Sequence, residues 1–241
     1  MHINRGNGMA VRRLAGTSCR FRQGKSIMHM QEKDSSPICI QVEDVTKRFK
    51  ENIGLDHVSL SFTRNRIHGI IGRNGSGKTV LFKCICGFMK PDSGRILIGG
   101  RPVKPLAPQD IGIIIEDSGF ISSMSGFRNL QLLASINHRI SSEGIRETMR
   151  TVGLDPDSRK HVGKYSLGMR HRLGIAQAIM EDPEILILDE PMNGLDRQGV
   201  EEIRKLLLSL KERGRTILLS SHYAEDIQVL CDTVHEMDGG K

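Results

Sequence analysis

A glycine-rich loop between a strand and a helix is the feature that most constrains the fold of this 241-residue chain. Residues 66–71 are typical of a strand, and a helical pattern begins at Lys78. The loop and the first helical residues are Gly72, Arg73, Asn74, Gly75, Ser76, Gly77, Lys78 and Thr79. Glycines let successive N–H groups face inward, and the following helix adds positive potential at its N-terminus. This spacing predicts a nucleotide phosphate site, in which Lys78 reaches the β- and γ-phosphates and Thr79 coordinates Mg²⁺.

A second strand ends in two acidic residues. Residues 185–188 are all apolar, which predicts a buried strand, and Asp189 and Glu190 follow directly. Open α/β sheets bind ligands at the carboxyl ends of their strands. We therefore expect Asp189 to bind Mg²⁺ through water, and Glu190 to orient or deprotonate the attacking water.

Strands alternate with helices in the later part of the chain. This order predicts an α/β fold with a parallel sheet, and the glycine loop makes that sheet a P-loop NTPase core. The strand-rich start adds an N-terminal antiparallel β subdomain, and the helical middle adds a helical subdomain at about residues 120–165. The expected strands are 38–45, 57–62, 66–71, 95–98, 111–115, 184–188 and 216–219. The expected helices are 78–87, 127–150 with a break where Ser142 caps a new helix, 168–180 and 197–213.

Most of the positive charge belongs to the N-terminal segment. Residues 1–31 carry six basic residues and no acidic ones, so of the net charge of +7 only +1 remains for the other residues. Residues 1–36 are therefore predicted to be a basic disordered tail before an ATPase domain at 37–241. A start of translation at Met28 or Met30, or an organellar transit peptide, would also explain this composition. The nearly neutral remainder argues against a nucleic-acid partner.

Residues 165–170, Tyr-Ser-Leu-Gly-Met-Arg, resemble the signature motif of the ATP-binding-cassette (ABC) family. The resemblance covers about residues 38–237. Ser166 and Gly168 match the key positions, while Leu167 and Met169 replace the family's Gly and Gln. The resemblance implies that Ser166 and Gly168 contact the γ-phosphate held by a second cassette in a head-to-tail dimer. Taken alone, Ser166 is a typical helix cap.

Three smaller matches agree with this family. Residues 193–196, Asn-Gly-Leu-Asp, resemble its D-loop, and His222 resembles the histidine that contacts the γ-phosphate. Phe49 lies where the family has an aromatic residue that stacks on adenine. Without the resemblance, Phe49 would be interpreted as a core residue and His222 as structural.

Glu116 departs from the family pattern, which has Gln after the strand at 111–115. Together with Ser-Leu-Gly-Met in the signature, Glu116 resembles the branch that handles lantibiotics and bacitracin-like peptides. A carboxylate here would add charge to the Mg²⁺ site. A tolerated polar exchange is the alternative.

The resemblance implies an ATP-hydrolysing subunit of an ABC transporter that drives transport. The expected cargo is an antimicrobial peptide, and the expected direction is export. Its expected cofactors are ATP and Mg²⁺, and its expected partners are separate transmembrane permease subunits and a second cassette, in a homodimer or heterodimer. No run of about 18 apolar residues occurs, so we expect a cytoplasmic protein, peripheral on the inner face of the membrane. A soluble ABC ATPase acting on ribosomes or DNA, another P-loop enzyme such as a kinase, and a regulatory ATP-binding module are the alternatives.

Overall fold

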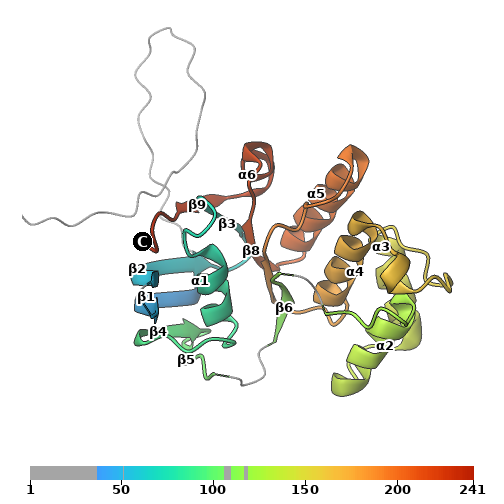
Figure 1. The fold of residues 1–241 in the computed structure, drawn as a ribbon, viewed down its shortest axis with the longest axis horizontal. Coiled ribbons are helices and arrows are strands. Elements are labelled where there is room, and N and C mark those ends of the chain that lie inside the picture. The colour runs from blue at the N-terminus through green and yellow to red at the C-terminus, as the bar shows by residue number, and fades with distance from the viewer. Residues whose placement is uncertain (1–36, 51, 106–109, 117–118) are drawn as a thin grey trace, which may run out of the picture.

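Two sheets and a group of helices make up the fold (Figure 1). The computed structural model describes residues 37–50, 52–105, 110–116 and 119–241. The predicted disordered tail at 1–36 lies outside these residues. A four-stranded sheet has the order β2-β1-β4-β5, and a five-stranded sheet has the order β6-β7-β8-β3-β9. The first is antiparallel and the second is parallel, which confirms the predicted fold class.

The antiparallel sheet contains longer strands than the sequence pattern predicts. Its strands are β1 Ile38–Phe49, β2 Asn52–Thr63, β4 Ser93–Ile98 and β5 Arg101–Pro102. The pairing of β1 with β2 shifts register between Val42 and Val45, and Asp44 there has a φ of +50°. A bulge of this kind breaks the two-residue alternation, so the pattern ends although the strand continues.

The parallel sheet carries the glycine loop and the acidic strand end. Its strands are β3 Ile67–Ile71, β6 Ile111–Ile114, β7 Ile185–Leu188, β8 Thr216–Ser220 and β9 Thr233–Glu236. All residues of β7 and β8 are buried, as continuous apolar strands require. The neighbouring helices are α1 Lys78–Ile85, α5 Arg197–Glu212 and α6 Ala224–Leu230.

Three further helices lie together on the opposite side of the molecule from the antiparallel sheet (Figure 1). They are α2 Gly126–Asn137, α3 Ser142–Thr151 and α4 Leu167–Ile179, and a short 3-10 turn at Val162–Lys164 precedes α4. Ser141 caps α3, because its hydroxyl accepts from the Gly144 N–H. The prediction that Ser142 caps this helix was therefore wrong by one residue. Among the described residues, no helix has the length and apolar character needed to span a membrane.

Helix α4 packs against α2 and α3 through buried apolar side chains, and a substitution there tests this packing. Leu173 on α4 is fully buried in the cluster that contains Leu130 and Met149. We expect Leu173→Ala to lower the free energy of unfolding by about 3 kcal/mol, because it leaves a cavity that the core cannot fill. Leu132→Ala removes the same atoms from a side chain that is 48% exposed, and should change stability by less than about 0.5 kcal/mol. Urea denaturation of both variants measures the difference, and equal losses would contradict the packing.

Candidate nucleotide site

The glycine loop turns from β3 into α1 through backbone conformations that favour glycine. Gly77 has a φ of +102°, and a Cβ there would collide with the Gly54 carbonyl oxygen on β2. Lys78 is buried, and its ammonium donates to the carbonyl oxygens of Gly72 at 2.7 Å and Arg73 at 3.1 Å. The loop therefore holds a positive charge at the N-terminus of a helix, which is an arrangement that favours a bound anion.

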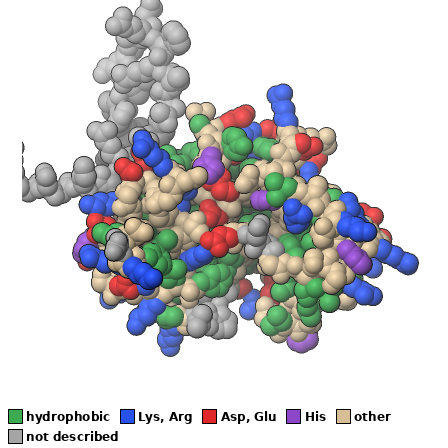
Figure 2. Space-filling model, in the orientation of Figure 1, with side chains coloured by type: hydrophobic (Ala, Val, Ile, Leu, Met, Phe, Trp, Pro, Cys, Tyr) green, Lys and Arg blue, Asp and Glu red, His purple; other side chains and the backbone are tan. Residues whose placement is uncertain are grey.

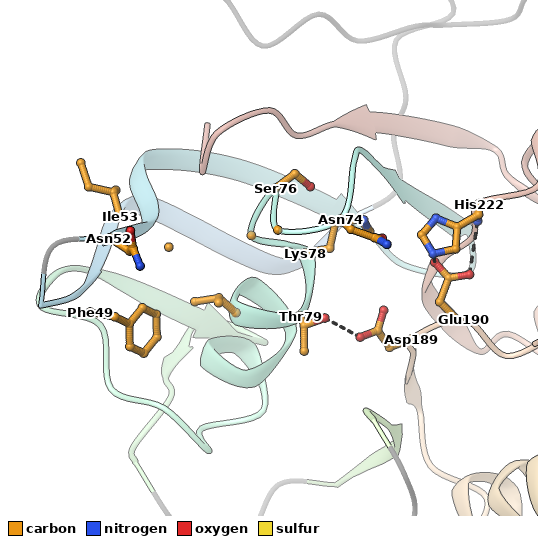
Figure 3. Close-up of a pocket in the computed structure, with 14 residues that line it drawn as sticks. Phe49, Asn52, Ile53, Asn74, Ser76, Lys78, Thr79, Asp189, Glu190 and His222 are labelled. Atoms are coloured by element: carbon orange, nitrogen blue, oxygen red, sulfur yellow. Dashed lines mark hydrogen bonds and ion pairs between the residues drawn. The ribbon is translucent and has the colours of Figure 1, made fainter.

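One hydrogen bond joins the start of α1 to the end of β7 (Figure 3). The Thr79 hydroxyl donates to Asp189 Oδ2 at 2.7 Å. The Ser220 hydroxyl donates to the second carboxylate oxygen, Oδ1, at 2.5 Å. Hydroxyl and carboxylate oxygens are the ligands that hard divalent cations prefer. Two of the three residues that the sequence assigns to the Mg²⁺ site, Thr79 and Asp189, thus lie in direct contact.

Glu190 and His222 form a second pair beside Asp189 (Figure 3). His222 Nε2 lies 3.0 Å from Glu190 Oε1, and the His222 backbone N–H donates to Oε2 at 3.2 Å. Burial raises the pKa of the Glu190 carboxyl above its ordinary value, although the neighbouring His222 opposes this shift. A carboxylate with a raised pKa is better suited to accept a proton than an exposed one.

These residues line one cavity of about 560 Å³, which has the size of a small-molecule site. Its polar part contains the loop from Asn74 to Thr79 together with Asp189, Glu190 and His222. Its other end contains Phe49 at the end of β1 and Asn52 and Ile53 at the start of β2. The Phe49 ring is 40% exposed, so its face is available to a flat ligand. In Figure 2, acidic side chains gather near the middle of the face shown.

Ser166, Gly168 and Glu116 lie outside this cavity lining. The Ser166 hydroxyl accepts from the Met169 N–H at 3.2 Å and caps α4. A Cβ at Gly168 would lie 3.0 Å from the Gly194 carbonyl oxygen, so this segment packs against residues 193–196. The Glu116 carboxylate accepts from Lys83 Nζ at 2.6 Å. The structure therefore does not bring Glu116 to Thr79 and Asp189.

Sequence reasoning missed Ser220, which contacts both acidic residues from β8. The Ser-Ser pair before His222 was a usable signal, because polar residues at the end of an apolar strand face the ligand edge of a parallel sheet. Asn52 and Ile53 were also missed. They lie in a hairpin whose register the alternation pattern does not reveal.

The strand, glycine loop and helix, with an acidic strand end in contact, define a P-loop nucleotide-binding protein. The family model described as ABC transporter matches residues 55–193, more than half of the chain. An uncharacterized ABC transporter ATP-binding protein of Bacillus subtilis is 41% identical, over 84% of this chain and 94% of its own length. The chain therefore belongs to the ABC transporter family, as an ATP-binding cassette with ATPase function, which confirms the predicted family and activity.

Two named relatives and one solved structure add detail. The bacitracin transport ATP-binding protein BcrA of Enterococcus faecalis is 40% identical, over 83% of this chain and 67% of its own length. The lantibiotic transport ATP-binding protein SrtF of Streptococcus pyogenes is 32% identical, over 84% of this chain and 88% of its own length. An ATP-binding cassette solved as a dimer with ADP and phosphate matches with a TM-score of 0.77, over 83% of this chain and 95% of its own length. At 22% sequence identity, this match shows a similar fold.

Proposed function

We propose that the chain hydrolyses ATP with Mg²⁺ in the cavity between the glycine loop and the acidic strand end. The observation that carries this proposal is the contact of Thr79 with Asp189 beside the pair of Glu190 and His222. Lys78 would exchange its two loop carbonyls for the β- and γ-phosphates, which are stronger partners for an ammonium group. Phe49 would stack on the adenine at the other end of the cavity.

Thr79 and Asp189 are the proposed metal ligands. Their hydroxyl and carboxylate oxygens suit Mg²⁺, which prefers oxygen donors and retains several waters. When bound there, Mg²⁺ would neutralise the negative charge that develops on the phosphates. Glu116 would join the ligands only by exchanging its ion pair with Lys83. A direct ligand role for Glu116 therefore requires that its carboxylate leave Lys83.

Glu190 is the proposed general base for the attacking water, and His222 its partner. The raised pKa of Glu190 favours proton acceptance, and the imidazole fixes the direction of the carboxylate. His222 is about half exposed at the cavity edge, where it can also reach a terminal phosphate. In this proposal the proton acceptor lies next to the proposed metal-binding carboxylate of Asp189, as hydrolysis of a terminal phosphate requires.

A second cassette would complete each site. Ser166 and Gly168 lie outside the cavity of their own chain, and Leu167 between them is exposed. The N-terminus of α4 presents N–H groups and positive potential, which suit the γ-phosphate of a facing copy. A head-to-tail pair would thus sandwich two ATP molecules. The dimeric cassette with the same fold supports this arrangement.

The proposed cargo is a peptide antibiotic, exported through separate transmembrane permease subunits at the inner face of the cell membrane. Support comes from the relatives named for bacitracin and lantibiotic transport. Cargo selection would belong to the permease. The cassette would supply the closing and reopening motion that hydrolysis drives.

Antibiotic susceptibility tests the cargo. Deletion of the gene in its host should increase sensitivity to bacitracin or to a lantibiotic, and only the wild-type allele should restore resistance. A Glu190→Gln allele, expressed at the same level, should not restore it, because resistance requires hydrolysis. Sensitivity to an aminoglycoside is the control and should not change. Unchanged peptide sensitivity in the deletion strain would contradict this cargo and leave the ATPase proposal intact.

A further inference from the structure

Ser220, at the end of β8, lies within hydrogen-bond distance of both acidic residues, Asp189 and Glu190. Strands β7 and β8 are parallel neighbours, and Leu188 pairs with Leu219. Ser220, the last residue of β8, therefore lies beside Asp189, the first residue after β7. Its side chain is fully buried. A buried hydroxyl requires hydrogen-bond partners, so its contacts determine its role.

The Ser220 hydroxyl contacts both acidic residues in different ways. It donates to Asp189 Oδ1 at 2.5 Å and accepts from the Glu190 backbone N–H at 3.0 Å. Glu190 Oε1 lies 3.5 Å from the same hydroxyl. A serine hydroxyl has one proton to donate, and the shorter distance assigns that proton to Asp189. Glu190 Oε1 then remains available to His222 at 3.0 Å.

Each contact fixes one geometric feature of the site. The bond to Asp189 Oδ1 sets the carboxylate plane, so that Oδ2 faces Thr79. The bond from the Glu190 N–H stabilises a backbone with a φ of +52°, which residues with side chains rarely adopt. This conformation turns the Glu190 side chain from the strand end toward His222.

The neighbouring serine serves a different partner. Ser221 donates to Asp226 Oδ2 at 2.7 Å, and Asp226 is paired with Arg204 on α5. Ser221 is the first residue after β8, and its hydroxyl lies against Asp226 of α6, so the two serines have different partners. Of these two serines, it is Ser220 that holds the acidic strand end.

We propose that Ser220 is a positioning residue that orients both Asp189 and Glu190 for hydrolysis. The inference rests on the proposed function, because that function assigns Asp189 to the metal and Glu190 to the water. Ser220 acts through these two residues and touches neither ATP nor water in the proposed reaction. Outer contacts of this kind change metal affinity or activity by about 10- to 100-fold when they are removed.

The test compares Ser220→Ala with Ser220→Thr in the full chain. Ser220→Ala should lower kcat by about tenfold or more and raise the half-saturating Mg²⁺ concentration by about tenfold, because both carboxylates lose their orientation. Ser220→Thr retains the hydroxyl and should recover most of both losses. Ser209→Ala, which removes a half-buried hydroxyl of α5 bonded to the Leu206 carbonyl oxygen, is the matched control and should behave as wild type.

A binding measurement provides a readout that does not depend on turnover. Calorimetry with AMP-PNP should give the same affinity for wild type and Ser220→Ala in EDTA. With Mg²⁺ present, the alanine variant should bind about tenfold more weakly than wild type. If Ser220→Ala does not fold, as judged by circular dichroism, Ser220→Cys takes its place. A thiol has a similar size but forms only weak hydrogen bonds, so this variant should show the same losses of kcat and Mg²⁺ affinity.

Two results would overturn the inference. One is a folded Ser220→Ala or Ser220→Cys protein with kcat and Mg²⁺ dependence within twofold of wild type. The other is a Ser220→Thr protein that is as stable as wild type and yet as impaired as the alanine variant, since the hydroxyl would then not be the cause. Failure of the proposed function is distinguishable, because wild type itself would then not hydrolyse ATP, or Glu190→Gln would be as active as wild type.

Discussion

Replacing Glu190 with glutamine is expected to lower kcat for ATP hydrolysis by at least about a hundredfold, while ATP affinity stays within about twofold. Glutamine has nearly the same size as glutamate but cannot accept the proton of the attacking water. Both Glu190 oxygens contact His222, one through the ring and one through the backbone N–H. An amide retains only one acceptor for these two contacts. Phosphate release measures turnover, and calorimetry with AMP-PNP measures binding.

A matched exchange separates this effect from a general change of charge. Glu212→Gln alters an exposed residue at the end of α5 and should leave kcat and affinity unchanged. Because the proposed dimer reopens after hydrolysis, Glu190→Gln should also accumulate as a dimer with ATP in gel filtration, whereas wild type should not. Turnover by Glu190→Gln within about threefold of wild type would show that another group accepts the proton.

The glycine loop and the acidic strand end were predictable because each depends on neighbouring residues. A loop that needs a positive φ at Gly77 requires glycine there, and a strand buried on both faces is apolar throughout, as β7 is. Such local requirements are visible in the order of residues. The parallel sheet was predicted from the alternation of strands and helices, and the structure confirms it.

Features that depend on distant partners could not be predicted from one sequence. The ion pair of Glu116 with Lys83 joins residues 33 positions apart, and the contact of Ser220 with Asp189 joins residues 31 apart. Helix α6 has seven residues and no side-chain cap, while β9 is an edge strand paired only with β3 among the described strands. Neither has a strong local signal, because tertiary packing and not propensity stabilises short elements.

Lys78→Ala and Ser166→Asp should each lower ATPase activity by at least about a hundredfold, for different reasons. The first removes the cation that binds the β- and γ-phosphates of its own chain. The second retains the cap of α4, because aspartate caps helices as well as serine does. It nevertheless places a negative charge against the phosphate of the facing copy. If Ser166 were only a helix cap, Ser166→Asp would hydrolyse ATP like wild type.

Mixing these two inactive variants should restore activity if each site combines Lys78 of one chain with Ser166 of the other. In an equal mixture about half of the dimers contain one chain of each kind, and each such dimer has one intact site of two. Recovered activity should therefore approach about one quarter of wild type. Lys78→Ala mixed with Glu190→Gln is the matched control, because both residues belong to the same half of a site and no intact site can form. Absence of recovery, with mixed dimers verified by two affinity tags, would contradict the assignment of Ser166 to the opposite ATP.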